Sequence, residues 1–81
     1  MLAINDAPTR AYLESRRIHP TQEFRTRRDG RTVLSMTVRG TDELKYWILG
    51  FGPHLEVLRP ASLRAEVGRL LADAARAYGA T

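Results

Sequence analysis

Two histidines and no cysteine limit the chemistry that this 81-residue chain can perform. His19 precedes a proline at a predicted helix end, and His54 follows a proline in a predicted turn. Neither histidine lies in a motif that activates a nucleophile, and two histidines without neighbouring ligands do not make a metal site. We therefore expect no catalytic, cofactor-binding or metal-binding residues, and we expect that the protein is not an enzyme.

Arginine is the one residue type with functional potential. The chain has 13 basic and 9 acidic residues, a net charge of +4, and every basic residue except Lys45 is arginine. Arginine makes planar, bidentate contacts with phosphates and carboxylates, although a GC-rich genome would also explain the bias. Five arginines fall on or beside a predicted β-hairpin: Arg25, Arg27, Arg28, Arg31 and Arg39. They could contact nucleic-acid phosphates or an effector, or they could form a solvated face partly neutralised by Glu23 and Glu56, which we favour.

The length and composition predict one small domain with a marginal core. The hydrophobic fraction of 43% and the charged fraction of 27% are ordinary for a globular protein. The longest apolar stretch, around Trp47 to Phe51, is too short to span a bilayer, and the N-terminus does not resemble a secretory signal. We expect a cytoplasmic protein without a membrane partner.

The hydrophobic pattern and the turn residues predict seven elements. They are a strand at Leu2–Asn5, a helix at Pro8–Arg17, strands at Thr21–Arg28 and Thr32–Arg39, a helix at Thr41–Gly50, a strand at His54–Leu58 and a helix at Ala61–Tyr78. Asp6 and Thr41 are the predicted N-caps. The order β-α-β-β-α-β plus a C-terminal helix is typical of an α+β, ferredoxin-like split βαβ sandwich. That fold has an antiparallel four-stranded sheet with the strand order 4-1-3-2, and we expect the first two helices on its inner face.

The hairpin at Arg28-Asp29-Gly30 allows two registers. A two-residue Asp29-Gly30 turn would pair Phe24 with Ser35, whereas a three-residue loop with Gly30 left-handed pairs Phe24 with Leu34 and Gln22 with Met36. The second register gathers the apolar residues on one face, so we choose it. The predicted core comprises Leu13, Phe24, Leu34, Met36, Val38, Leu44, Trp47, Ile48, Leu55, Val57, Val67 and Leu70.

Some apolar residues fall outside this predicted core. Val33 and Leu58 are expected on the outer sheet face, and Tyr46 and Leu49 lie off the core stripe of their helix. A contiguous apolar group marks an interface, and a small core benefits from association. We therefore predict a symmetric homodimer through the outer sheet face or the last helix, with the sheet face preferred.

Four segments in order resemble one known family. Arg16–Gln22 (RRIHPTQ) resembles the segment RRxHPSQ of the WCX domain, and Asp29-Gly30 falls at the hairpin of that domain. Glu43–Gly52 resembles its helix E(L/V)xxW(L/I)LxFG, and Glu56–Arg64 resembles its segment EVLEPxxLR. The chain departs from the last pattern at Arg59, where an acid is expected.

The resemblance implies a bacterial WYL-type transcriptional regulator with a winged helix-turn-helix domain, a WYL domain and a C-terminal WCX domain. Residues 1–81 would be the WCX-like domain alone, because neither the DNA-reading helix nor the WYL residues are present. The expected function is that of a regulatory and dimerisation module that transmits effector binding to the DNA-binding domain. The alternative is a stand-alone module that binds nucleic acid weakly and without sequence preference through its arginine face.

Overall fold

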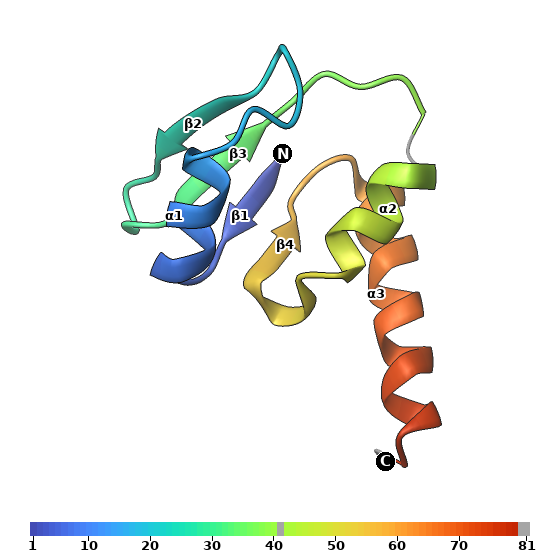
Figure 1. The fold of residues 1–81 in the computed structure, drawn as a ribbon. Helices are drawn as coiled ribbons and strands as arrows, with labels where there is room; N and C mark the ends of the chain where they lie inside the picture. The colour runs from blue at the N-terminus through green and yellow to red at the C-terminus, as the bar shows by residue number, and fades with distance from the viewer. Residues whose placement is uncertain (41, 80–81) are drawn as a thin grey trace.

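Four short strands and three helices alternate along the chain in the computed structural model, which describes residues 1–40 and 42–79 (Figure 1). The elements are β1 (Leu2–Ile4), α1 (Ala7–Glu14), β2 (Glu23–Thr26), β3 (Thr32–Ser35), α2 (Asp42–Leu49), β4 (Leu55–Val57) and α3 (Ala61–Ala77). A single turn of 3-10 helix, Gly52–His54, leads into β4. The described part of the chain contains no helix that is both long and apolar enough to cross a membrane.

The strands form one antiparallel sheet in the order β2-β3-β1-β4. Read from the β4 edge, this order is 4-1-3-2. The first strand is therefore interior, with Leu2 opposite Leu34 on one side and Val57 on the other. The predicted class, α+β with a four-stranded antiparallel sheet, is confirmed.

The β2–β3 hairpin has the predicted register. Phe24 pairs with Leu34, and the backbone N–H of Arg27 donates to the carbonyl of Arg31 at 2.8 Å. Three residues remain in the loop, and Gly30 has φ 88°, the left-handed conformation that such a loop needs. The three-residue loop is confirmed, so Leu34 faces the helices.

The two hairpin strands are half as long as predicted. The prediction that Gln22 pairs with Met36 is wrong, because the ladder ends one pair earlier, at Glu23 and Ser35. Gln22 Oε1 accepts the N–H of Ile18 at 2.6 Å, and Thr21 Oγ1 accepts the N–H of Thr37 at 2.9 Å. These side-chain bonds replace the last bonds of the ladder.

The helix ends follow the predicted caps in part. Asp6 caps α1, with its Oδ2 accepting the N–H of Thr9 at 3.4 Å. The helix ends at Glu14 and not at Arg17. The other predicted cap, Thr41, lies outside the described residues.

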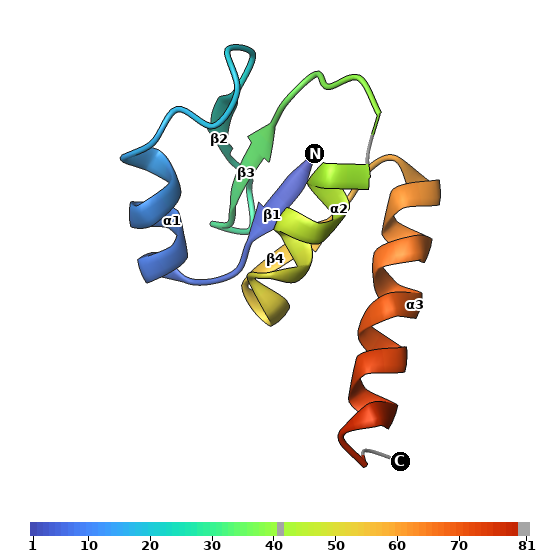
Figure 2. The same cartoon turned by 45° about the vertical axis from the view of Figure 1, so that its right-hand side comes forward.

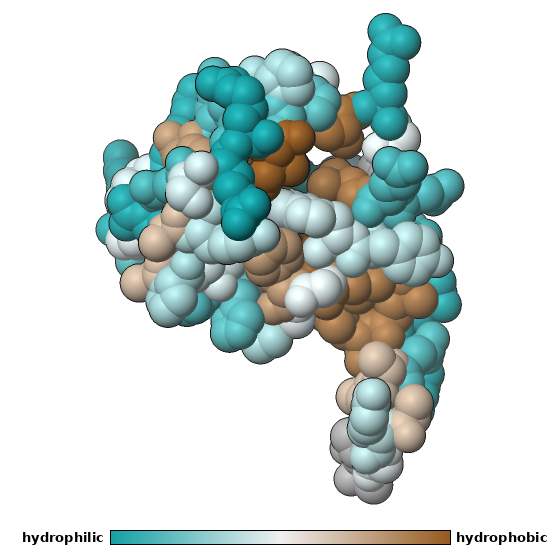
Figure 3. All heavy atoms as spheres, viewed as in Figure 1, coloured by the Kyte–Doolittle hydropathy of each residue, from teal (hydrophilic) through white to brown (hydrophobic). Residues whose placement is uncertain are grey.

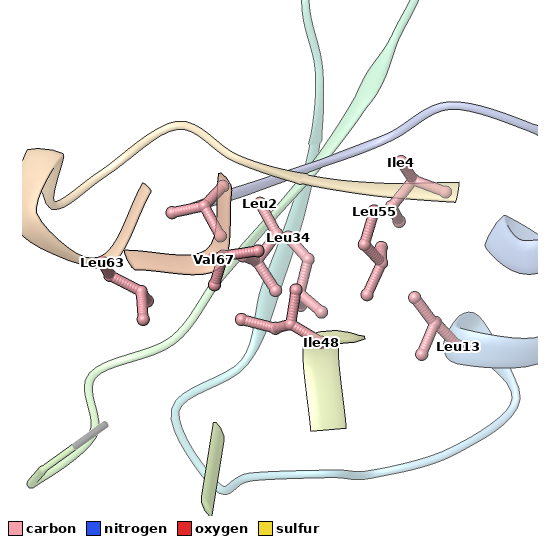
Figure 4. Close-up of a cluster of buried hydrophobic side chains, with 9 residues drawn as sticks. Leu2, Ile4, Leu13, Leu34, Ile48, Leu55, Leu63 and Val67 are labelled. Atoms are coloured by element: carbon pink, nitrogen blue, oxygen red, sulfur yellow. The ribbon is translucent and has the colours of Figure 1, made fainter. Parts of the chain in front are cut away.

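The core lies on one face of the sheet and receives side chains from all three helices (Figure 4). Its nine buried residues are Leu2, Ile4, Leu13, Leu34, Ile48, Leu55, Val57, Leu63 and Val67. Six of the predicted core residues are buried, whereas Phe24, Met36, Val38, Leu44, Trp47 and Leu70 are half-buried. Several of these half-buried residues line an open groove between the end of β3 and α2, which explains their partial exposure.

An ion pair joins α2 to α3. Lys45 Nζ of α2 lies 2.6 Å from Glu66 Oε1 of α3, and only 11% of the Lys45 side chain is exposed. The hydrogen bond from Lys45 is the largest cause that lowers the pKa of the Glu66 carboxyl, and the lysine charge adds to it. Since only the first half of α3 packs on the core, this pair anchors the helix where it leaves the body (Figure 2).

Thr32→Val is expected to stabilise the protein. The Thr32 hydroxyl is buried and has no hydrogen-bond partner among the described residues. Valine has nearly the same shape and favours strands, so removing an unsatisfied hydroxyl should raise the free energy of unfolding by about 1 kcal/mol. Urea denaturation measures this change, and Thr26→Val at the exposed paired position is the control. A loss of stability in Thr32→Val would show that the hydroxyl has a partner, such as a bound water.

Glu66→Gln should make the stability less sensitive to acid. A carboxyl whose folded-state pKa is lowered contributes stability above its unfolded pKa, near 4.5, and that contribution is lost as the pH falls through the folded pKa. The wild-type protein should therefore lose more stability than Glu66→Gln between pH 7 and about pH 3. Urea denaturation at both pH values measures the difference, with Glu43→Gln on α2 as the control. Equal losses in wild type and Glu66→Gln would contradict the role of the pair.

Candidate functional site

The five predicted arginines do not form one patch. Arg25 and Arg27 line a groove on the outer face of the sheet, which is the face turned away from the helices. Arg39 lines a different groove beside α2, and Arg28 is exposed in the hairpin loop. Arg31 Nη1 lies 3.2 Å from a carboxylate oxygen across the sheet. Only two of the five arginines therefore come together.

Glu56 of β4 neutralises one half of the outer face. Its two carboxylate oxygens lie 3.2 Å from Arg31 Nη1 and 2.8 Å from Arg64 Nη1. The hydrogen bond from Arg64, reinforced by the charges of both arginines, lowers the pKa of Glu56. Because β1 lies between β3 and β4, the Arg31–Glu56 pair crosses the central strand at the level of Ala3, whose small side chain leaves room for it.

The other half of the outer face contains a groove of about 330 Å³. Three arginines line it: Arg25, Arg27 and Arg59. Val33 and Leu58 also line it, and Val33 is only 4% exposed. Arg59 was not among the predicted site residues, although its departure from the expected acid in the segment Glu56–Arg64 was a signal that could have identified it.

The predicted interface residues differ in their exposure. Tyr46 is exposed at 65%, Leu49 and Leu58 are half-buried, and Leu49 packs against the core. Val33 lies on the outer face as predicted, but the prediction that it is exposed there is wrong. Its strand is interior to the sheet, so only a small part of its side chain remains accessible, at the groove that it lines.

Exposed apolar residues are also present on α3 and directly after it. Leu71, in the half of α3 that extends past the sheet, is 38% exposed, and Tyr78, the C-cap residue after the helix, is 92% exposed. Figure 3 shows a hydrophobic patch over α3 where the helix leaves the body. Leu71 and Tyr78 are thus apolar side chains that the described residues leave exposed.

The segment His19–Gln22 is a structural clamp. Gln22 Oε1 accepts the N–H groups of Ile18 and His19, and its Nε2 donates to the carbonyl of Arg16 at 2.8 Å. Thr21 Oγ1 accepts the N–H of Thr37 at 2.9 Å and donates to its carbonyl at 3.2 Å. These bonds fix the turn after α1 against the end of β3.

A groove of about 770 Å³ lies between this clamp and α2. Its apolar wall includes Ile18 and Trp47, and its polar rim includes His19, Arg39 and Glu43. The groove thus brings together two of the sequence segments that carry the family resemblance, RRIHPTQ and the helix that contains Trp47. An apolar groove with a few polar groups at its rim is suited to binding.

Each histidine has a close polar contact through its Nδ1 atom. His19 Nδ1 lies 2.8 Å from Thr21 Oγ1 and accepts the N–H of Thr21 at 3.2 Å. His54 Nδ1 lies 3.2 Å from Asp6 Oδ1, beside the N-cap of α1. Among residues 1–40 and 42–79, no three histidine and acidic side chains gather in a group that could hold a metal ion.

The family model of the WCX domain matches residues 3–75 of this chain. The chain belongs to the WCX domain family. A search of curated proteins gives no match. In this WCX domain, the histidine-proline segment and the Trp47 helix both form walls of one groove, and Gln22 holds the first of these walls in place.

Gln22→Ala is expected to destabilise the WCX domain. The substitution leaves two half-buried N–H groups without their acceptor, which should lower the free energy of unfolding by about 1–3 kcal/mol. Gln22→Glu, which keeps the acceptor and loses only the donor to Arg16, should lose less. Urea denaturation of both variants measures the difference. Wild-type stability in Gln22→Ala would show that the turn does not depend on this side chain.

Proposed function

We propose that this WCX domain is the C-terminal regulatory and dimerisation module of a cytoplasmic bacterial WYL-type transcriptional regulator. It acts by binding and not by catalysis, and it transmits effector binding to a winged helix-turn-helix domain on the same polypeptide. The observation that carries the proposal is the family match over residues 3–75.

The geometry of the domain supports this function in two ways. The groove beside Trp47 offers a partner or ligand an apolar wall with polar groups at its rim. The exposed half of α3 offers a second apolar surface, away from that groove. A module with two separate surfaces is suited to coupling one binding event to another.

The fold proposal is the ferredoxin-like split βαβ arrangement. It is supported by the strand order 4-1-3-2, by the antiparallel pairing of all neighbouring strands, and by helices that follow β1 and β3. In this arrangement, β1 and β3 are the interior strands, and their connecting helices contribute Leu13 and Ile48 to the shared core.

The alternative function, weak nucleic-acid binding through Arg25, Arg27, Arg28, Arg31 and Arg39, has less support. Arg31 is paired with Asp29 and Glu56, and Arg39 lies in the groove beside α2. The positively charged side chains therefore lie at separate places on the surface of the domain. A phosphate backbone is bound best by a continuous basic surface.

Sequencing the transcript that contains this coding sequence tests the proposed role in a regulator. If the role is correct, long-read sequencing of cellular RNA will show a WYL-domain reading frame that continues in frame into the codon for Met1. A transcript in which a stop codon separates the two frames would contradict a module on the same polypeptide.

Self-association of this chain is expected to depend on α3. Size-exclusion chromatography with light scattering should give a dimer mass at high micromolar concentration, and Leu71→Glu should give a monomer because a buried charge at the interface is costly. Tyr46→Glu places the same charge on exposed α2 and is the matched control. A monomer mass for the wild-type chain would contradict dimerisation by this domain, and a monomer for Tyr46→Glu alone would move the interface to α2.

A further inference from the structure

The outer-face groove combines positive charge with an apolar floor. Arg25 reaches it from β2, Arg27 from the end of that strand, and Arg59 from the segment after β4. Its floor includes Val33 and Leu58, with Ser35 beside them. The three arginines come from separate parts of the chain, so the fold and not the local sequence brings them to one groove.

The charge of this groove is little neutralised by the protein. Among the described residues, neither Arg27 nor Arg59 has a carboxylate within ion-pair distance. Arg25 lies 3.6 Å from Glu23, but both side chains are largely exposed, so this pair contributes little. The other acid of the outer face, Glu56, is engaged by Arg31 and Arg64 and does not line the groove.

We propose that this groove binds a phosphate ester. Guanidinium groups bind phosphate oxygens through bidentate, charge-assisted hydrogen bonds, and the Ser35 hydroxyl adds another donor. The apolar floor of Val33 and Leu58 would accept the organic part of the ester, and a volume of about 330 Å³ holds a small group rather than an extended duplex. Mononucleotides and single-stranded nucleic acid share this chemistry. The site is independent of the proposed role in a regulator, because it uses neither the groove beside Trp47 nor α3.

Arg59 determines the specificity of this groove. The sequence pattern that Glu56–Arg64 resembles has an acid at this position, which would oppose a phosphate in the same place. The backbone N–H of Arg59 donates to the Met1 carbonyl, and its carbonyl accepts a hydrogen bond from the Met1 amino group; neither bond involves the Arg59 side chain. Replacing the side chain should therefore change the ligand and leave the fold intact.

NMR titration of the full 81-residue chain at low salt tests the proposal. The probes are AMP, a short oligothymidylate, and adenosine as the control without phosphate. AMP or the oligonucleotide should shift the backbone amide signals of Val33, Ser35 and Leu58, and adenosine should not. Arg59→Glu should weaken binding about tenfold or more, the loss expected for one charge-assisted hydrogen bond. Arg28→Glu makes the same charge change in the exposed hairpin loop and should weaken binding much less.

The choice of probes distinguishes a free nucleotide from nucleic acid as the source of the phosphate, and several results would overturn the proposal. Binding of AMP supports a free nucleotide, and binding of the oligonucleotide alone supports nucleic-acid phosphates. The absence of binding by both, equal shifts with adenosine, or equal losses in Arg28→Glu and Arg59→Glu would overturn the site. If Arg59→Glu fails to fold, as its amide spectrum would show, the double variant Arg25→Gln and Arg27→Gln replaces it with the same expected loss.

Discussion

The three-residue strand β1 joins the two halves of the molecule. It pairs with β3 on one side and with β4 on the other, so the hairpin and the β4–α3 unit share a sheet only through Leu2, Ala3 and Ile4. All three residues are buried, with Leu2 and Ile4 in the helix-covered core and Ala3 on the opposite face. Because only these three residues connect the two halves, the stability of the small core depends on how well each of them packs.

The same strand organises the charges of the outer face. The Arg31–Glu56 ion pair crosses β1 where Ala3 gives it space, and Arg64 of α3 binds the second oxygen of Glu56. Glu56 of β4 therefore neutralises arginines on only one half of the outer face. Arg25, Arg27 and Arg59 remain on the other half, so the positive charge of this face is concentrated there.

Local patterns in the sequence predict the parts of the fold that local physics determines. The hairpin register follows from the apolar alternation around Gly30, and the N-cap at Asp6 follows from its place before Pro8. The lengths of the hairpin strands do not follow, because they depend on where the side chains of Thr21 and Gln22 find backbone partners. The residues of the candidate grooves are still harder to predict, since only the folded sheet makes Arg59 line the same groove as Arg25 and Arg27.

Two buried residues show how tertiary packing overrides a one-dimensional pattern. Val33 alternates with core residues and so belongs to the outer face, yet its strand lies inside the sheet and its side chain is covered. Lys45 lies next to the apolar stripe of α2, yet α3 covers it and supplies Glu66 as its partner. In both cases the burial depends on where the element lies in the folded chain and not on the local pattern alone. The exposed half of α3 has no such neighbour within the described chain, and a second copy of the same helix would supply the missing apolar contact for Leu71 and Tyr78.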